Sequence, residues 1–381
     1  MNKFTELTVE ENLRYKHHLS LPDLGQKGQL RLKNSSVLIV GLGGLGSPVA
    51  TYLAAGGIGT IGLVDSDSVD ISNLQRQILY DTNDVGKSKC EVAAKKLAQT
   101  NPEAIIKSFN QTLNKTNVKE IFDSFDVVVD CTDNLASKYL INQAAIEFNI
   151  PMVYGSVYQF EGQVSVFNYQ SEACYQCLFP NSSNLSTPSC NDAGVLGVVP
   201  GIVGGLQANE VFKIVGQFGS PLSNQLLTFN SLDNSFKTFS FEKDKDCSTC
   251  SAVANSDELL DYRSQINSQE TPMDVPQITP TDLKTKLDNA ESVFILDVRE
   301  SSEWEVSNLS SLGAVHIPKG EVAERIAELN KDAETVVHCR SGGRSSNIVE
   351  FLAGEGFTNV CNLDGGLTRW SEDVDTTMDV A

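Results

Sequence analysis

Short apolar runs alternate with helical periodicity through the first two thirds of the chain. Residues 37–40 are Val-Leu-Ile-Val, which is typical of a strand buried on both faces, and an Ala-rich helix is expected to follow and to end near residues 55–57. Further strands are predicted at 61–64, 127–129 and 152–154, with a helix at 137–148. This alternation predicts an α/β fold, a Rossmann-like and mostly parallel sheet with helices on both faces.

The pattern is interrupted once and then resumes. Residues 253–276 are rich in Ser, Asn, Gln, Asp, Glu and Pro, which predicts a flexible acidic linker. Beyond it, a helix is predicted to open at 281–283, with strands at 293–296 and 335–337. We therefore expect a first domain over 1–252, the linker over 253–276, a second and smaller α/β domain over 277–372, and a frayed tail over 373–381.

Composition narrows the classes of function. The chain of 381 residues has a formal charge of -20, which opposes direct binding to a nucleic-acid phosphate backbone. Its first residues lack the apolar core of a signal peptide, and its apolar stretches are broken before membrane-spanning length. The nine cysteines are an odd number and include two Cys-x-x-Cys pairs, which favours metal and thiol chemistry in a reducing compartment. A cytoplasmic protein is expected.

A glycine-rich loop follows the first predicted strand. Gly41-Leu42-Gly43-Gly44-Leu45-Gly46 has the GxGxxG spacing, which lets backbone N–H groups and a helix N-terminus face a phosphate. Asp65, at the end of the next strand, suits a ribose hydroxyl. Taken alone, these features favour a nicotinamide-dependent oxidoreductase, which binding of NAD without any response to ATP would support.

Three further segments favour a different nucleotide. The chain has Ser-Asn-Leu-Gln-Arg-Gln at 72–77, Lys89, and Asp-Cys-Thr-Asp-Asn at 130–134. An Arg and a Lys can neutralise a triphosphate, and a carboxylate can hold Mg²⁺. With these motifs, residues 10–250 resemble the MoeB/ThiF superfamily, the adenylyltransferases that are similar to ubiquitin-activating enzymes.

The resemblance implies a set of residues that bind ATP and its magnesium, and it implies a homodimer. Asp133 would coordinate Mg²⁺, and Arg76 would also act in catalysis. The second arginine of the family's Arg-Tyr-x-Arg motif reaches ATP across the dimer. The motif is here Arg14-Tyr15-Lys16-His17, so either Lys16 or His17 would have to replace that arginine. The residues implied to contact the nucleotide are Gly41, Gly43, Gly44, Asp65, Ser72, Asn73, Leu74, Gln75, Arg76, Lys89, Asp133 and Asn134.

Two cysteine pairs have the spacing of zinc ligands. Cys174-x-x-Cys177 and Cys247-x-x-Cys250 offer four thiolates, which is a complete tetrahedral set for Zn²⁺. A full set leaves no open coordination position. The predicted role is therefore structural, and it ties a loop within the first domain to the end of that domain.

Cys339 begins a second loop of chemical interest. Two arginines, two glycines and a predicted helix start follow it, and all of these favour an anionic sulfur. Residues 277–371 resemble the rhodanese family at Leu-Asp-Val-Arg-Glu (296–300), Gly-Ala-Val-His-Ile-Pro (313–318) and Asp-Gly-Gly (364–366), although Ser-Asn-Leu at 307–309 replaces the usual Gly-His. We predict a persulfide on Cys339, with Arg340 and Arg344 as catalytic partners; the opposing interpretation is an inactive docking domain.

The remaining cysteines divide into one candidate and a core group. Cys190 lies in a polar stretch between apolar segments, and in relatives this position forms a thioester with the carrier protein or attacks a disulfide on it. We predict that Cys190 is catalytic. Cys90, Cys131 and Cys361 are interpreted as core thiols, and His316 and His338 are given no chemical role.

Together the resemblances imply a fused adenylyltransferase and sulfurtransferase. ATP would activate the C-terminal glycine of a small ubiquitin-like sulfur carrier that ends in Gly-Gly, and the Cys339 persulfide, loaded from a persulfide or thiosulfate donor, would convert it to a thiocarboxylate. Molybdopterin, thiamin, cysteine and tRNA thiolation remain open as pathways. The alternative is protein conjugation, in which Cys190 takes the carrier as a thioester and the rhodanese domain only docks.

Overall fold

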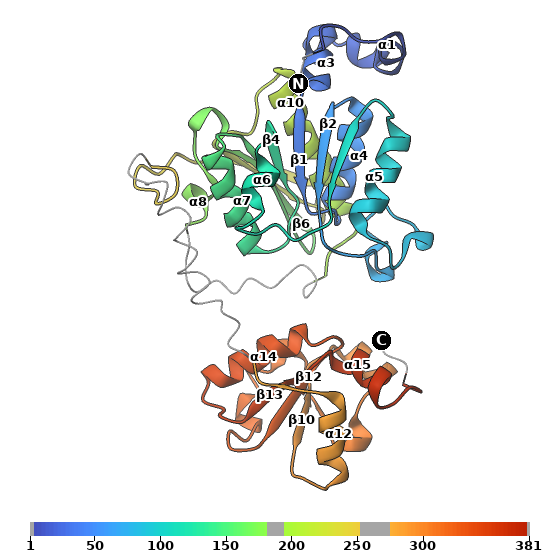
Figure 1. The fold of residues 1–381 in the computed structure, drawn as a ribbon. Helices are drawn as coiled ribbons and strands as arrows, with labels where there is room; N and C mark the ends of the chain where they lie inside the picture. Colours follow the sequence, from blue (N-terminus) through green and yellow to red (C-terminus); the bar gives the residue numbers. More distant parts are fainter. Residues whose placement is uncertain (1–3, 181–193, 252–274, 379–381) are drawn as a thin grey trace. The chain divides into compact units, whose positions relative to one another are not determined.

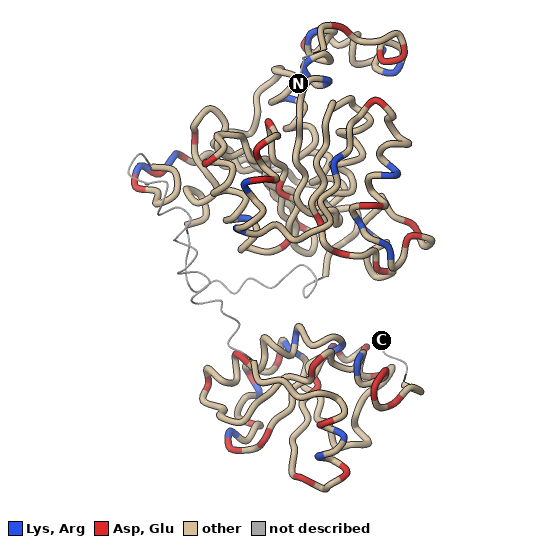
Figure 2. The backbone as a smooth tube through the Cα atoms, in the orientation of Figure 1, with Lys and Arg blue, Asp and Glu red and all other residues tan. Residues whose placement is uncertain are grey.

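The computed structural model describes residues 4–180, 194–251 and 275–378. The chain forms two compact units, Met1–Tyr262 and Arg263–Ala381, and each has its own sheet (Figure 1). The predicted linker at 253–276 falls almost wholly outside the described residues, so its boundaries stay predictions. Asp and Glu are spread over both units, with Lys and Arg lying among them (Figure 2).

The first unit has an eight-stranded sheet in the order β3-β2-β1-β4-β5-β6-β7-β8. The pairs from β3 to β5 are parallel, and those from β5 to β8 are antiparallel. The sheet is therefore parallel in the half that carries the glycine-rich loop. Its strands are β1 (Ser36–Val40), β2 (Thr60–Val64), β3 (Ile105–Phe109), β4 (Val127–Asp130), β5 (Met152–Tyr158), β6 (Glu161–Phe167), β7 (Gln225–Asn230) and β8 (Ser235–Ser240).

Helices cover both faces of this sheet, as predicted. Alternate residues of β1 face opposite sides: Val37 and Ile39 lie in one apolar cluster, whereas Leu38 and Val40 lie in the other. The helices are α1 (Val9–Arg14), α2 (Lys16–Leu19), α3 (Gly25–Lys33), α4 (Gly46–Gly56), α5 (Lys89–Thr100), α6 (Val118–Phe122), α7 (Leu135–Glu147), α8 (Tyr175–Leu178) and α10 (Val198–Gly216). Because α4, α5 and α10 supply the first cluster and α6 and α7 the second, both faces of the central strands β1, β2 and β4 are shielded from water.

The second unit is a smaller α/β domain, as predicted. Its five strands are all parallel, in the order β11-β10-β12-β13-β9, and Val336 and Val337 of β12 face opposite apolar clusters. The strands are β9 (Gln277–Ile278), β10 (Phe294–Asp297), β11 (Val315–His316), β12 (Thr335–His338) and β13 (Val360–Leu363). The helices are α12 (Pro280–Asp288), α13 (Ser301–Val306), α14 (Gly343–Gly354) and α15 (Gly366–Asp373).

Within the described ranges, no helix is both long enough and apolar enough to cross a membrane.

Candidate functional sites

A cavity of about 370 Å³ lies at the carboxyl ends of β1, β2, β4 and β5. In a parallel sheet this edge is where ligands bind, because the loops that leave the strands meet there. Nine of the predicted ATP-contacting residues line the cavity, and Ser72, Leu74 and Gln75 do not. The nine are Gly41, Gly43, Gly44, Asp65, Asn73, Arg76, Lys89, Asp133 and Asn134.

The glycine-rich loop is shaped by close backbone contacts. Gly41 has a φ of 92°, and a side chain on it would meet the carbonyl oxygen of Cys131 at 2.7 Å. A side chain on Gly46 would meet the carbonyl oxygen of Gly41 at 2.0 Å. Only glycine fits these two positions, so the loop can turn tightly between β1 and α4 and leave its backbone open to the cavity.

Asp65 is positioned by two backbone amides. Its Oδ2 accepts a hydrogen bond from the Leu42 N–H at 2.7 Å, and its Oδ1 accepts one from the Asp67 N–H at 2.8 Å. Burial raises the pKa of the Asp65 carboxyl, although nearby Lys89 and the two amides oppose this effect. Each carboxylate oxygen keeps acceptor capacity for a hydroxyl group.

Lys89 contributes a buried cation to the cavity wall. Its side chain is 5% exposed, and its Nζ lies 2.8 Å from Oδ2 of Asp67. Asp67 itself lines the cavity and was not among the predicted residues, although its place two residues after Asp65 was a usable signal. Gln111, Thr112, Ser137 and Ser156 were also missed, because they come from segments without a motif.

Arg76 lies just beyond the short 3₁₀ helix Ile71–Asn73. Its guanidinium donates to the Ser72 carbonyl at 3.1 Å and to Gln75 Oε1 at 3.2 Å. Ser72 and Gln75, which do not line the cavity, thus hold the arginine that does. Sequence reasoning had placed all three residues on the nucleotide itself.

Asp133 and Asn134 follow β4. The Asn134 side chain caps α7 by accepting a hydrogen bond from the Ser137 N–H at 2.8 Å. The exposed carboxylate of Asp133 lines the cavity and has no hydrogen-bond or ion-pair partner among the described residues. Such a carboxylate, in a cavity that Arg76 and Lys89 also line, is the kind of ligand that Mg²⁺ takes, so Asp133 fits the predicted magnesium site.

The four cysteines of the two Cys-x-x-Cys pairs converge as predicted. Their sulfur atoms all lie within 4.8 Å of one another, and Cys174 Sγ is 3.7 Å from Cys247 Sγ. Tetrahedral zinc with Zn–S bonds of about 2.3 Å requires sulfur separations of roughly 3.8 Å, so this cluster is compatible with a structural zinc site. It joins the segment around α8 to the segment after β8.

Cys339 starts the loop between β12 and α14. Its side chain is 1% exposed, and its Sγ accepts hydrogen bonds from the Gly342 N–H at 3.2 Å and the Ser345 hydroxyl at 3.3 Å. Donors that converge on a sulfur stabilise it as an anion. The observed donors are a backbone amide and a hydroxyl of the loop, and the persulfide on Cys339 stays a prediction.

The Asp-Gly-Gly motif at 364–366 supports the same loop. The N–H groups of Leu367 and Thr368, at the start of α15, each donate at 2.9 Å to the carbonyls of Cys339 and Arg340. A side chain on Gly366 would meet those carbonyl oxygens at 2.5 and 2.6 Å. The second glycine therefore lets the helix approach closely enough to hold the loop.

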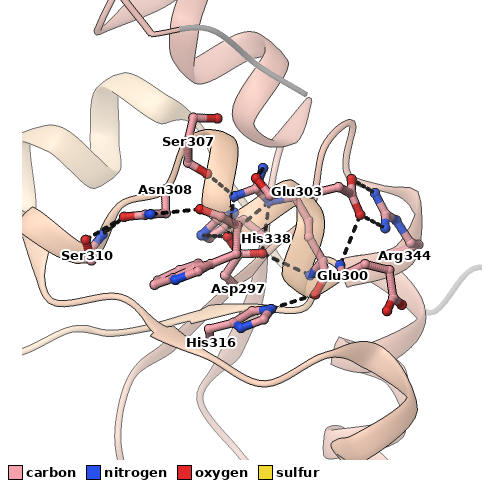
Figure 3. A network of polar contacts seen from close by, with 11 residues as sticks. Asp297, Glu300, Glu303, Ser307, Asn308, Ser310, His316, His338 and Arg344 are labelled. Carbon is pink, nitrogen blue, oxygen red and sulfur yellow. Dashed lines mark hydrogen bonds and ion pairs between the residues drawn. The ribbon is translucent and has the colours of Figure 1, made fainter.

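The two arginines of the loop have different surroundings. Arg344 forms a bidentate ion pair with Glu303 of α13, with both N–O distances 2.6 Å (Figure 3). Burial opposes ionisation of Glu303, but the hydrogen bonds from Arg344 and the Glu300 amide lower its pKa. Arg340 is exposed and has no ion-pair partner in the described part of the chain, so no carboxylate there neutralises its charge.

A fully buried cluster lies on the strand side of the loop. Arg299 donates to Asp297 through Nε and Nη2, and its Nη2 also donates to the Ser307 carbonyl at 2.6 Å. His338 Nε2 is 3.7 Å from Asp297 Oδ2, too far for a hydrogen bond (Figure 3). The Leu-Asp-Val-Arg-Glu motif thus fixes α13, and with it Glu303.

The remaining predicted residues are Cys190, the three cysteines interpreted as core thiols, and the Arg-Tyr-Lys-His segment. Cys190 lies outside the described residues. Cys90 and Cys131 are buried and Cys361 is half-buried, although Cys131 also lines the nucleotide cavity. In the Arg-Tyr-Lys-His segment, Tyr15 is buried and accepts a hydrogen bond from Asn101 Nδ2 at 2.8 Å. Neither Lys16 nor His17 lines the cavity.

Two family models match this chain, one in each of its two units. The ThiF family model matches residues 15–249, and the rhodanese-like domain model matches residues 279–373. A protein of Porphyra purpurea named "Probable molybdopterin-synthase adenylyltransferase" is 41% identical over 374 residues, which are 97% of this chain and 95% of that protein.

Two further relatives match along nearly the whole chain. "Probable adenylyltransferase/sulfurtransferase MoeZ" of Mycobacterium tuberculosis (strain ATCC 25618 / H37Rv) is 35% identical over 98% of this chain and 96% of its own length. "Adenylyltransferase and sulfurtransferase MOCS3" of Drosophila willistoni is 39% identical over 97% of this chain and 85% of its own length.

Among solved structures, E. coli MccB with ATP matches with a TM-score of 0.53 and 26% identity, covering 59% of this chain and 68% of MccB. The chain belongs to the ThiF family, and it is an adenylyltransferase and sulfurtransferase whose second unit is a rhodanese-like domain.

Proposed function

We propose that the two domains act in turn on the C-terminal glycine of one small ubiquitin-like sulfur carrier. The observation that carries the proposal is the presence, in one chain, of a cavity of about 370 Å³ with a buried Lys89 in its wall and a cysteine loop whose donors converge on Cys339. A carboxylate is a poor electrophile until it is activated, and sulfur in a persulfide is a strong nucleophile. The chain has a site for each requirement.

In the first step, the carrier carboxylate attacks the α-phosphate of ATP and releases pyrophosphate, which leaves an acyl adenylate. Lys89 and Arg76 stabilise the charge that develops on the phosphates, and the N-terminus of α4 faces them. Asp65 orients the nucleotide through its ribose. Magnesium, bound at Asp133 with the nucleotide, would supply further neutralisation of phosphate charge.

In the second step, the terminal sulfur of a Cys339 persulfide attacks the activated carbonyl carbon, and AMP leaves. The product is an acyl disulfide between the carrier and Cys339. A thiolate, proposed to be Cys190, then attacks Cys339 Sγ; the carrier leaves as a thiocarboxylate, and the two cysteines form a disulfide that an external thiol reduces before the next cycle. Arg340 provides the cationic group for a persulfide or thiosulfate donor.

The names of relatives support a sulfur-carrier pathway of the kind used for molybdopterin. We further propose that the protein is a cytoplasmic homodimer and that its function requires no direct contact with nucleic acid.

The test of the proposed function is exchange of labelled pyrophosphate into ATP in the presence of a purified Gly-Gly-ended carrier. Exchange that requires the carrier and its terminal glycine supports the proposal. A stable carrier thioester on Cys190, lost in Cys190→Ser and formed without any thiocarboxylate, would instead favour protein conjugation.

A further inference from the structure

A lysine is buried directly beneath the nucleotide cavity. Lys138 lies in the first part of α7, and 5% of its side chain is exposed. Its Nζ donates to Oδ2 of Asp130 at 2.8 Å, to the Thr132 carbonyl at 2.8 Å and to the Gly155 carbonyl at 3.1 Å. Burial of an ammonium group is costly unless it is paired and fully hydrogen-bonded, and here all three donors have acceptors.

Asp130 uses its other oxygen on the same loop. Oδ1 accepts hydrogen bonds from the Thr132 N–H at 3.0 Å and from the Thr132 hydroxyl at 2.6 Å. Thr132 is therefore held at its amide, its side chain and its carbonyl by one ion pair. The next two residues along the chain are Asp133 and Asn134, which line the cavity.

The same lysine also reaches the neighbouring strand. Gly155 belongs to β5, and Ser156 and Val157, which follow it, line the cavity together with the loop after β4. One ammonium group thus bridges the two strand ends that form this part of the wall. Tyr154 of β5 lies with its ring centroid 5.0 Å from the Lys138 ammonium and adds a cation–π contact to it.

We propose that Lys138 and Asp130 are positioning residues of the adenylation site. Neither lines the cavity, so they act through the loop at 131–134, whose backbone they hold so that Asp133 faces the nucleotide and its metal. The inference rests on the proposed function of Asp133. Because outer partners that orient a metal ligand typically contribute on the order of 10- to 100-fold to metal affinity or activity, loss of this bridge weakens the site without removing any group that touches ATP.

The test replaces two largely buried ion pairs, one at the site and one away from it, by uncharged amides in the full-length chain and compares the results. Single substitution of Lys138 would leave Asp130 buried and unpaired, so the variant is Asp130→Asn/Lys138→Gln, in which amides of similar size keep hydrogen-bonding capacity. The matched control is Glu11→Gln/Lys33→Gln, a pair 2.6 Å apart with 2% and 11% of the side chains exposed and away from the cavity. A third variant, Lys138→Arg, keeps the charge.

The readouts are the melting temperature, the dissociation constant for MgATP by calorimetry, and the Mg²⁺ concentration that gives half-maximal binding. We expect the 130/138 variant to bind MgATP on the order of 10- to 100-fold more weakly and to need more Mg²⁺. The 11/33 control should change only the melting temperature, and Lys138→Arg should recover part of the affinity.

Wild-type affinity and Mg²⁺ dependence in a folded 130/138 variant would overturn the proposal, as would an equal loss of affinity in the 11/33 control. Failure of the wild type to bind MgATP would also overturn it. If the wild type binds MgATP but activates no carrier, the proposed function is overturned, whereas the comparison of MgATP affinity between the 130/138 variant and the 11/33 control still tests the role of Lys138 and Asp130.

Discussion

His338 predicts a pH-dependent stability of the rhodanese-like domain. Its side chain is fully buried, neither ring nitrogen has a hydrogen-bond partner among the described residues, and desolvation lowers its pKa from 6.5 to about 4. The Asp297 carboxylate opposes this shift and Arg299 adds to it. An unfolded chain therefore binds a proton below pH 6.5 that the folded domain does not bind until about pH 4.

This difference in proton binding sets the direction and the size of the change in the free energy of unfolding with pH. Stability contributed by the neutral histidine is present above pH 6.5 and is lost as the pH falls toward 4. For a single group with these two pKa values, the free energy of unfolding drops by about 2 kcal/mol between pH 7.5 and pH 5. Replacement by Leu removes the titrating group and loses no hydrogen bond of the ring in the described structure.

The assay uses the only two tryptophans of the sequence, Trp304 and Trp370, which both lie in the second unit. Urea unfolding followed by tryptophan fluorescence therefore reports this domain within the full-length chain. Between pH 7.5 and pH 5, the free energy of unfolding of this domain should fall by about 2 kcal/mol more in the wild type than in His338→Leu. Equal pH dependence in the two proteins, with His338→Asn also matching wild type, would refute the reasoning.

Three other predictions follow from the sites. Cys174→Ser should lower the zinc content of the purified protein and destabilise the first unit by several kcal/mol, measured by elemental analysis and thermal melting; unchanged zinc would refute the metal assignment. Lys89→Ala should raise the KM for ATP by about tenfold or more, whereas Lys87→Ala, at an exposed ion pair, should change it little; equal effects would argue against a phosphate role for Lys89. Arg340→Ala should raise the KM for thiosulfate more than a substitution that breaks the Glu303 pair, Glu303→Gln, which should mainly lower the melting temperature; the reverse order would contradict the role given to the Arg340 charge.

Four strands of the parallel half, β1, β2, β4 and β5, were predictable because they are largely buried on both faces and form continuous apolar runs. The fifth, β3, was not predicted, because it is a partly exposed edge strand whose sequence includes Lys107 and Ser108. The antiparallel half was not identified, since β8 is mostly exposed and its Phe236 and Phe239 are about half exposed. The Cys-x-x-Cys spacing was enough to predict the four-cysteine cluster. Patterns over a few residues therefore identified the buried strands, which form continuous apolar runs, and the cysteine pairs, whose spacing is set by the geometry of zinc coordination.

Contacts between residues far apart in the chain could not be predicted from the sequence. Arg344 looked like an available cation of the Cys339 loop, but Glu303, 41 residues earlier, pairs with it. Lys138 belongs to no motif, and only the fold shows that it is buried between two strand ends. In both cases the role depends on tertiary neighbours, which a motif does not record.

The central claim is that one chain activates a carboxylate and then delivers sulfur to it from Cys339. The most direct measurement is the intact mass of a Gly-Gly-ended carrier after incubation with MgATP, thiosulfate and the protein, comparing wild type with Cys339→Ser and with Cys361→Ser as a control in the same domain. The account predicts exchange of one carrier oxygen for sulfur with wild type and Cys361→Ser, and pyrophosphate release without this exchange for Cys339→Ser. Sulfur transfer that persists in Cys339→Ser, or an unchanged carrier mass with wild type despite pyrophosphate release, would contradict it.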